Sequence, residues 1–104
     1  MHINSGNMIL NLKKAQNLEV VKTPEKLNDR ELTRAIRDAI IAEEGAIKQY
    51  ESVVDATENK KAKEVLTSIA NEERVHIGEL QALLAILLPD EQEHLDDGKK
   101  EVED

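Results

Sequence analysis

Two stretches of the chain carry apolar side chains at intervals of three and four residues, the spacing that places side chains on one face of an α-helix. The first stretch reads Leu32, Ile36, Ile40, Glu43, Ile47, Tyr50 and Val54. The second reads Val65 or Leu66, Ile69, Glu73, His76 or Ile77, Leu80, Leu83 or Leu84, and Leu87. Glu43 interrupts the first row, and Glu73 and His76 interrupt the second. The pattern predicts two amphipathic helices whose buried faces carry polar groups.

Capping and breaking residues set the limits of these two helices. Asn28 with Glu31 three positions later predicts a capping box, so the first helix runs from about residue 29 to about residue 56. A turn at residues 57–59 follows, capped by Asn59 or Thr57, and the second helix runs from about residue 60 until Pro89 stops it. A turn this short makes the helices antiparallel, so residues 28–89 are predicted to form an all-α helical hairpin.

The segments that flank the hairpin are less regular. Residues 1–27 carry only short apolar runs and are interpreted as an N-terminal arm, with His2 exposed. Residues 90–104 contain eight acids against two lysines, which accounts for −6 of the net charge of −8. We expect one short helical piece at residues 91–95, followed by an acidic, mobile tail that includes an exposed His94.

The apolar surface of one hairpin exceeds what its two helices can cover. Phenylalanine and tryptophan are absent, so the core must be built from Leu, Ile, Val and Ala. The ends of the two rows carry more aliphatic surface than a contact between two helices buries. We therefore expect two hairpins to pair across a two-fold axis as a four-helix bundle.

The absence of cysteine limits the possible chemistry. Disulfides, thiolate zinc sites, iron–sulfur clusters and rubredoxin-type iron sites are excluded, so any metal is held by carboxylate oxygen and imidazole nitrogen. The net charge of −8 argues against nucleic-acid binding. No apolar run approaches the roughly 20 residues of a membrane span, and no signal-peptide pattern is present, so we expect a cytoplasmic location.

The polar residues that interrupt the two apolar rows have the spacing of metal ligands. Glu73 and His76 are three residues apart and share one helix face. An ionised carboxylate in an apolar seam costs several kcal/mol unless it is paired or binds a metal. A di-metal site in a four-helix bundle takes a Glu from each of two helices and a Glu-x-x-His from each of the other two. One chain supplies half of this set, with Glu43 as the lone carboxylate, and a symmetric pair completes it. Such ligands suit iron or manganese.

Other interpretations of these residues stay open. A Glu-x-x-His on a helix also occurs by chance as an exposed pair. Glu72 precedes His76 by four residues and is either solvated or on the path by which iron enters, and Glu79 follows His76 by three and is either close to the ligands or on the surface. Tyr50, the only aromatic residue, fits a core position with a hydrogen-bonded hydroxyl.

The combination of Glu43-x6-Tyr50 with Glu73-x-x-His76 resembles the ferritin-like di-iron superfamily. A single copy in a short chain resembles the encapsulated ferritins. Residues 40–51 and 72–79 are especially similar to the ferritin-like segment of archaeal encapsulins, and the resemblance covers about residues 29–97. It implies Glu43, Glu73 and His76 as iron ligands and Tyr50 near a ligand carboxylate. It also implies a ring-shaped homodecamer of five dimers, housed in a nanocompartment made by an encapsulin shell protein.

The function expected from these observations is that of a ferroxidase. Bridging glutamates hold two iron ions close enough to deliver two electrons together to dioxygen or peroxide, and the ferric product then passes to mineral storage in the encapsulin compartment. A rubrerythrin-like di-iron peroxidase would use the same ligands with an external electron donor. In a different functional class, the alternative is a metal-free protein that acts as an oligomeric scaffold or as a cargo adaptor.

Overall fold

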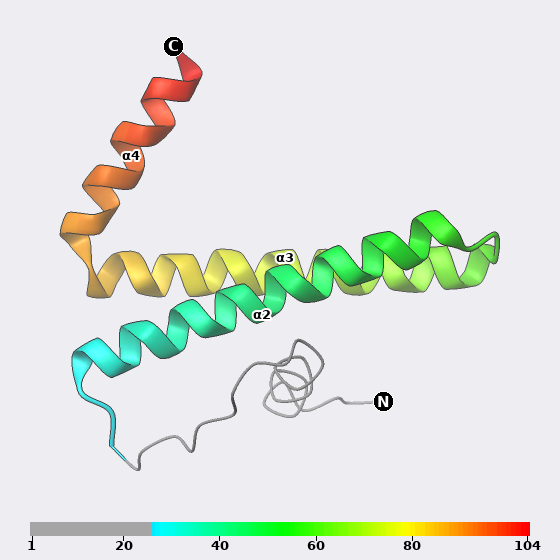
Figure 1. Cartoon of the computed structure of the whole chain (residues 1–104), viewed down its shortest axis with the longest axis horizontal. Coiled ribbons are helices and arrows are strands. Elements are labelled where there is room, and N and C mark those ends of the chain that lie inside the picture. The colour runs from blue at the N-terminus through cyan, green and yellow to red at the C-terminus, as the bar shows by residue number, and fades with distance from the viewer. Residues whose placement is uncertain (1–25) are drawn as a thin grey trace.

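The computed structural model describes residues 26–104, which form three helices (Figure 1). Helix α2 spans Asp29–Ala56, α3 spans Lys60–Leu87 and α4 spans Pro89–Glu103. Helices α2 and α3 lie antiparallel along most of their length, and α4 turns away from the end of α3 (Figure 1). The predicted all-α hairpin is confirmed. The predicted N-terminal arm lies outside the described residues except for residues 26 and 27.

Side-chain caps define the starts of the two hairpin helices. At α2, the Glu31 backbone N–H donates to Asn28 Oδ1 over 2.8 Å, and the Asn28 N–H donates to Glu31 Oε1 over 3.1 Å, which completes the predicted capping box. At α3, Asn59 Oδ1 accepts from the Ala62 N–H over 2.9 Å. Asn59 is therefore the cap, while the Thr57 hydroxyl oxygen accepts from the Asn59 N–H within the turn.

The core of the hairpin is one aliphatic stripe between α2 and α3. Its buried apolar residues are Ile36, Ala42, Ala46, Ile47, Ala70, Ile77 and Leu84. The predicted rows are confirmed at their centres, but Leu32, Ile40 and Leu80 are only half-buried, and Val65 and Leu83 are exposed. The three buried alanines were absent from the predicted rows. Their small side chains let the helices approach closely, whereas the edges of the rows are left partly exposed by residues 26–104.

Helix α4 is longer than predicted. The predicted helical piece at residues 91–95 lies in the first half of a helix that continues through Gly98 to Glu103, so the prediction of a tail is wrong for residues 96–103. Pro89 ends α3 and occupies the first turn of α4, where the missing N–H costs no hydrogen bond. First-turn acids and Lys100 in the last turn also complement the helix dipole.

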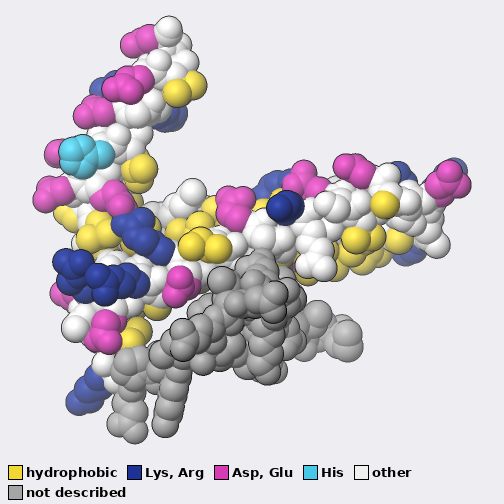
Figure 2. Space-filling view, viewed as in Figure 1, with side chains coloured by type: hydrophobic (Ala, Val, Ile, Leu, Met, Phe, Trp, Pro, Cys, Tyr) yellow, Lys and Arg dark blue, Asp and Glu magenta, His cyan; other side chains and the backbone are white. Residues whose placement is uncertain are grey.

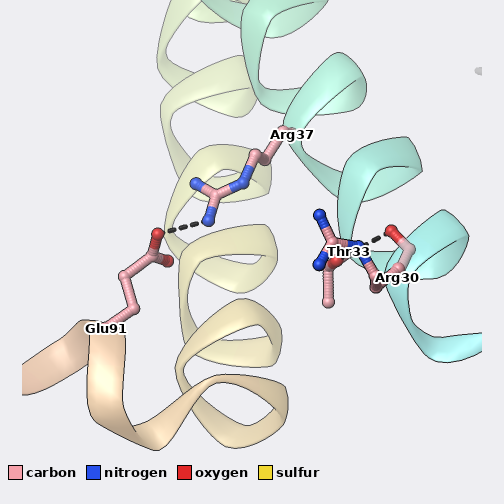
Figure 3. Close-up of polar contacts among 4 residues, drawn as sticks. All are labelled: Arg30, Thr33, Arg37 and Glu91. Atoms are coloured by element: carbon pink, nitrogen blue, oxygen red, sulfur yellow. Dashed lines mark hydrogen bonds and ion pairs between the residues drawn. The ribbon is translucent and has the colours of Figure 1, made fainter.

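A polar contact ties the start of α4 to α2. The Arg37 guanidinium donates to the Glu91 carboxylate, and the two side chains are 46% and 30% exposed (Figure 3). On the previous turn of α2, the Thr33 hydroxyl donates to the Arg30 carbonyl oxygen over 2.9 Å (Figure 3). Beyond its first turns α4 stands free of the hairpin and buries none of its residues.

Several aliphatic side chains face solvent on the described part of the chain (Figure 2). The large ones are Ile41, Val53, Val65, Val75, Leu83, Ile86, Leu95 and Val102. None of the helices in residues 26–104 is long and apolar enough to cross a membrane.

Candidate metal centre

The hairpin brings Glu43, Glu73 and His76 together at its middle. Glu43 lies fifteen residues before Glu58 in the turn and Glu73 fifteen residues after it. Antiparallel helices rise equally from a shared turn, so these two positions lie level with each other. One ligand atom from each of the three residues lies within 4.8 Å of the other two. The His76 Nδ1 atom is 3.4 Å from Glu73 Oε2 and 3.6 Å from Glu43 Oε2.

Both carboxylates are buried. Glu43 is 7% exposed and Glu73 is 4% exposed, and the aliphatic core residues surround them along the seam. The Oε2 atom of Glu43 is buried without a hydrogen-bond partner among the described residues. Two buried negative groups that converge on one point destabilise the fold unless a positive charge neutralises them.

His76 occupies the rim of this cluster. Its side chain is 48% exposed, so the prediction that it lies inside the buried seam is wrong for the isolated chain. A step of three residues turns a helix about 60° short of a full turn. The ring of His76 therefore lies beside Glu73 but at the edge of the contact between α2 and α3.

The donor set fits a divalent metal ion. Oxygen and nitrogen ligands bind such ions at about 2.0–2.2 Å, so ligand atoms on one ion are separated by about 3.0–4.4 Å. The two distances to His76 Nδ1, 3.4 and 3.6 Å, fall in this range. The Glu43 Oε2 atom at 3.6 Å has no hydrogen-bond partner among the described residues, so it is free to accept a metal ion. Two carboxylates and one imidazole suit iron, manganese or zinc, and leave coordination positions for further ligands.

The other candidate residues lie outside this cluster. Glu72 and Glu79 are exposed and are not among the converging ligand atoms. Tyr50 is half-buried two turns after Glu43, and within residues 26–104 its hydroxyl makes no hydrogen bond with Glu43, Glu73 or His76. The expected place of Tyr50 near a ligand carboxylate stays a prediction.

A contact that the sequence analysis did not predict crosses the hairpin near the cluster. Arg74, which follows Glu73, places Nη2 3.6 Å from Glu51 Oε2 on α2 and donates from Nη1 to Asn71 Oδ1 over 3.0 Å. The Arg74 and Glu51 side chains are 47% and 59% exposed, so the pair links α2 to α3 but contributes little to stability. Charged pairs of this kind are common on helix surfaces, so the sequence alone does not indicate that this pair links the two helices.

Comparison with known families is consistent with this geometry. The family model for rubrerythrin matches residues 4–84. The chain belongs to the rubrerythrin family. The match contains all of α2 and the part of α3 that carries Glu73 and His76.

Two curated relatives of this rubrerythrin-family chain are connected by name with encapsulins. The chain is 42% identical over 71 residues to the encapsulin nanocompartment cargo protein EncC of Myxococcus xanthus, covering 68% of this chain and 55% of the relative. It is 34% identical over 88 residues to a ferritin-like-encapsulin shell fusion protein of Pyrococcus furiosus, covering 85% of this chain and 26% of the relative. The chain thus spans about half of the first relative and a quarter of the second.

A solved structure shares the fold. The encapsulated ferritin domain of Pyrococcus furiosus superposes with a TM-score of 0.75 and 35% sequence identity, covering 80% of this chain and 85% of that domain. The resemblance to encapsulated ferritins stated from the sequence is confirmed. The chain is an all-helical, ferritin-like member of the rubrerythrin family.

Proposed function

We propose that the chain is a ferroxidase that oxidises Fe(II) to Fe(III) at a di-iron site shared between two subunits. The observation that supports this most directly is the buried Glu43 Oε2 without a hydrogen-bond partner, beside a second buried carboxylate and an imidazole. Folding tolerates such an acceptor when a cation fills the space between the ligands. Family membership favours iron as that cation.

The exposure of His76 supports the proposal that the site is shared. An imidazole that is 48% exposed at the rim of the cluster leaves the metal open on that side. On the same face of α3, seven residues on and eleven residues back, Leu83 and Val65 are 43% and 44% exposed. A second copy packed there by two-fold symmetry covers these side chains. It also brings a second trio against the first, for four carboxylates and two imidazoles in all.

The residues of the chain have distinct tasks in this reaction. Glu43, Glu73 and their symmetry mates bind two Fe(II) ions and compensate their charge, and His76 supplies a neutral nitrogen ligand. The aliphatic seam limits the access of water. Each Fe(II) gives up one electron, so the pair supplies two electrons to one molecule of dioxygen or peroxide. Tyr50 is proposed to hydrogen-bond a ligand carboxylate once the second copy is in place.

The names of the relatives support an encapsulin nanocompartment as the location of this activity. One is a cargo protein of an encapsulin nanocompartment and another is fused to an encapsulin shell. We infer that this chain works with an encapsulin shell protein as a ring-shaped homodecamer of five dimers, inside an encapsulin nanocompartment in the cytoplasm. A hairpin encloses no volume in which mineral can grow, so ferric product needs such a compartment for storage.

The rubrerythrin match favours a second candidate, a di-iron peroxidase. This enzyme would reduce peroxide through the same ligands, and because the chain has no cysteine, electrons would come from an external donor. Initial rates with dioxygen and with peroxide, each in the presence and absence of a donor, separate the candidates. A ferroxidase consumes Fe(II) in a stoichiometric amount, whereas a peroxidase turns over peroxide with catalytic iron.

An anaerobic titration with Fe(II) tests the shared site directly. Native mass measurement after each addition should show two iron ions per pair of chains, bound only by species that contain at least two chains. Two iron ions on a single chain, or iron retained after both Glu73→Ala and His76→Ala, would contradict the proposal. The exposed neighbour Glu44→Ala is the matched control and should bind iron normally.

A further inference from the structure

Helix α4 and the outer face of α3 carry apolar and small residues in matching order on either side of the elbow at residues 88 and 89. The α4 series is Leu95, Gly98 and Val102, and the α3 series is Ala82, Gly78 and Val75. Each series has the spacing of one helix face. Counted from the elbow, each member of one series lies level with its counterpart in the other to within one residue. An α4 folded back along α3 would therefore bring the two series together in register.

Both series are open to solvent in the described part of the chain. The exposed fractions are 57% for Leu95, 88% for Val102 and 62% for Val75. Nothing lies within 4 Å of a Cβ added at Gly78 or at Gly98. Glycines that face each other at one level allow two helix backbones to approach closely. Contact between the two series would also remove three aliphatic side chains from water.

The elbow between α3 and α4 already faces the first members of the two series toward one space. A groove of about 530 Å³ lies inside the elbow, and its lining includes Ala82, Ala85 and Leu95. Figure 2 shows hydrophobic side chains of α4 on the side of the helix that faces along α3. Closing the elbow would fill this groove with the apolar side of α4.

The sequence offers α4 a second place to begin. In the structure Leu88 is the N-cap residue and gives no side-chain hydrogen bond, and the Gln92 nitrogen is 3.4 Å from the Leu88 carbonyl oxygen, which is long for a helical bond. Asp90 and Glu93 have the spacing of a capping box. A helix that begins from an Asp90 cap leaves residues 88–90 as a turn of a length that joins antiparallel helices.

An ion pair holds α4 in its present position. The Arg37 guanidinium on α2 donates to the Glu91 carboxylate in the first turn of α4 (Figure 3). The two side chains are 46% and 30% exposed, so the pair is weak and is weakened further by salt. Among residues 26–104, the remainder of α4 stands clear of the hairpin (Figure 1).

We propose that α4 is a strap that closes onto the outer face of α3, and that the pair between Arg37 and Glu91 holds this strap open. Closure packs the α4 series against the α3 series, with the two glycines at the closest approach. It re-forms the first turn of α4 around Glu91 and so breaks the pair with Arg37. A single chain buries the aliphatic residues of α4 in this way. The strap needs neither iron nor the shared metal site.

Charge determines the direction in which salt acts on the strap. Residues 90–104 carry eight acids, and Glu72 and Glu79 are exposed beside the α3 series. These acids repel one another in the closed form. Salt screens this repulsion and also weakens the attraction between Arg37 and Glu91, so both effects favour closure.

Disulfide trapping in the full-length, iron-free chain tests the strap. The chain has no cysteine, so Val75→Cys with Val102→Cys introduces a single possible pair, and oxidation by diamide should join it within one chain. In the open form α4 stands away from α3, so the bond requires closure. Mass measurement and migration on a non-reducing gel identify the product. Added salt should raise the rate.

The control for trapping is Val75→Cys with Lys100→Cys. Lys100 is exposed and lies on the opposite side of α4 from Val102, because two residues along a helix differ by about 160°. The control pair should react at least about tenfold more slowly, since its Cβ atoms point apart in the closed form. Equal rates in the two variants, or bonds formed only between chains, would overturn the proposal. Bonds between chains would mean that a second copy covers the α3 series.

A leucine at Gly78 tests the register of the closed form. Open space surrounds Gly78 in the structure, so Gly78→Leu leaves the open form undisturbed. It blocks the close approach of the two glycines, so trapping of Val75→Cys with Val102→Cys should slow about tenfold. Thr67→Leu, at an exposed position of α3 beyond the reach of α4, is the control and should not slow it. An unchanged rate in Gly78→Leu would rule out this register.

Two further substitutions in the same trapping variant test the ion pair and the second cap. Arg37→Ala should raise the rate about two- to fivefold, the effect that an exposed ion pair supports, whereas Arg34→Ala on the preceding turn should not. Asp90→Ala should slow trapping about fivefold, and Asp90→Asn, which retains a capping side chain, should not. A rate that Arg37→Ala fails to raise, or equal rates in the two Asp90 variants, would count against the proposal.

Discussion

At the scale of single residues, burial distinguishes Glu43 from its neighbour Glu44. Glu43 and Glu44 are adjacent and chemically identical, yet only Glu43 is buried. The exposed carboxylate is solvated by water. The buried one has an oxygen without a hydrogen bond among residues 26–104 and lies close to a second buried carboxylate. The metal-free protein is therefore expected to be less stable than its aliphatic core alone would make it.

Replacing Glu43 by glutamine tests this strain. Glu43→Gln removes one buried charge, so the free energy of unfolding without metal should rise by about 1 kcal/mol. The stabilisation by Fe(II), about 2.7 kcal/mol for the natural chain when Fe(II) is at a hundredfold excess over its Kd, should disappear. Thermal melts with and without Fe(II) under anaerobic conditions measure both effects.

The adjacent position supplies the control for that measurement. Glu44→Gln makes the same chemical change on the exposed side of α2 and should leave both quantities within about 0.5 kcal/mol of the natural chain. If Glu43→Gln kept the full response to Fe(II), Glu43 would not be an iron ligand.

Tyr50 is predicted to affect rate rather than binding. Tyr50→Phe removes a hydroxyl that makes no hydrogen bond with the ligand trio within one chain. A hydrogen bond to a ligand carboxylate in the assembled protein is worth about 1 kcal/mol, so initial rates of Fe(II) oxidation should fall about fivefold. Iron bound per chain should not change. An unchanged rate would mean that Tyr50 is only a packing residue.

At the scale of elements, the hairpin is determined by its ends and by its central stripe. The capping box at Asn28 and the cap at Asn59 start the helices, and buried alanines allow them to approach closely. Because both helices leave a short turn, any residue on α2 has a partner level with it on α3. This geometry places Glu43 opposite Glu73 without any contribution from the flanking segments.

Removing the first cap should weaken the hairpin and spare the metal centre. Asn28→Ala leaves the Glu31 backbone N–H without its side-chain partner, so the free energy of unfolding should fall by about 1 kcal/mol in a denaturant titration. Iron stoichiometry should be unchanged, because Glu43 lies four turns away. Gln49→Ala, at an exposed position inside α2, is the control and should cost less than about 0.5 kcal/mol. Equal losses in both variants would argue against the capping box.

At the scale of the whole molecule, the chain leaves apolar surface on three sides. Val65 and Leu83 are exposed on the face of α3 beside His76, Ile41 is exposed on α2, and Leu95 and Val102 are exposed on α4. Residues 26–104 leave all of them uncovered, and the metal centre is open on the first side. Assembly is therefore expected to complete both the core and the site.

A lysine on the face of α3 beside His76 tests the link between assembly and chemistry. Leu83→Lys places a charge where the second copy is expected to pack, so the shared-site dimer should dissociate, and iron binding should be lost although all three ligands remain. Native mass measurement and iron analysis record the two effects together. Thr67→Lys adds the same charge on the opposite side of α3 and should leave both intact. Iron bound normally by a dissociated Leu83→Lys chain would show that one chain holds a complete site.

The part of the fold that the sequence predicts rests on local interactions. Helix spacing, caps and Pro89 act within about four residues of each other, so α2, α3 and the convergence of Glu43, Glu73 and His76 followed from the pattern. The helical piece predicted at residues 91–95 was too short, because the helix continues through Gly98 to Glu103. A glycine weakens a helix without necessarily ending it.

By itself, the sequence determined that two helices form, that they are antiparallel, and that a carboxylate from one meets a Glu-x-x-His from the other. Only the tertiary structure decided that His76 lies at the rim, that one oxygen of Glu43 has no hydrogen-bond partner among the described residues, and that α4 turns away with Leu95 and Val102 exposed. The physical reason is that periodicity specifies which residues share a face. The angle between helices, and hence what covers each face, depends on packing between residues far apart in the chain.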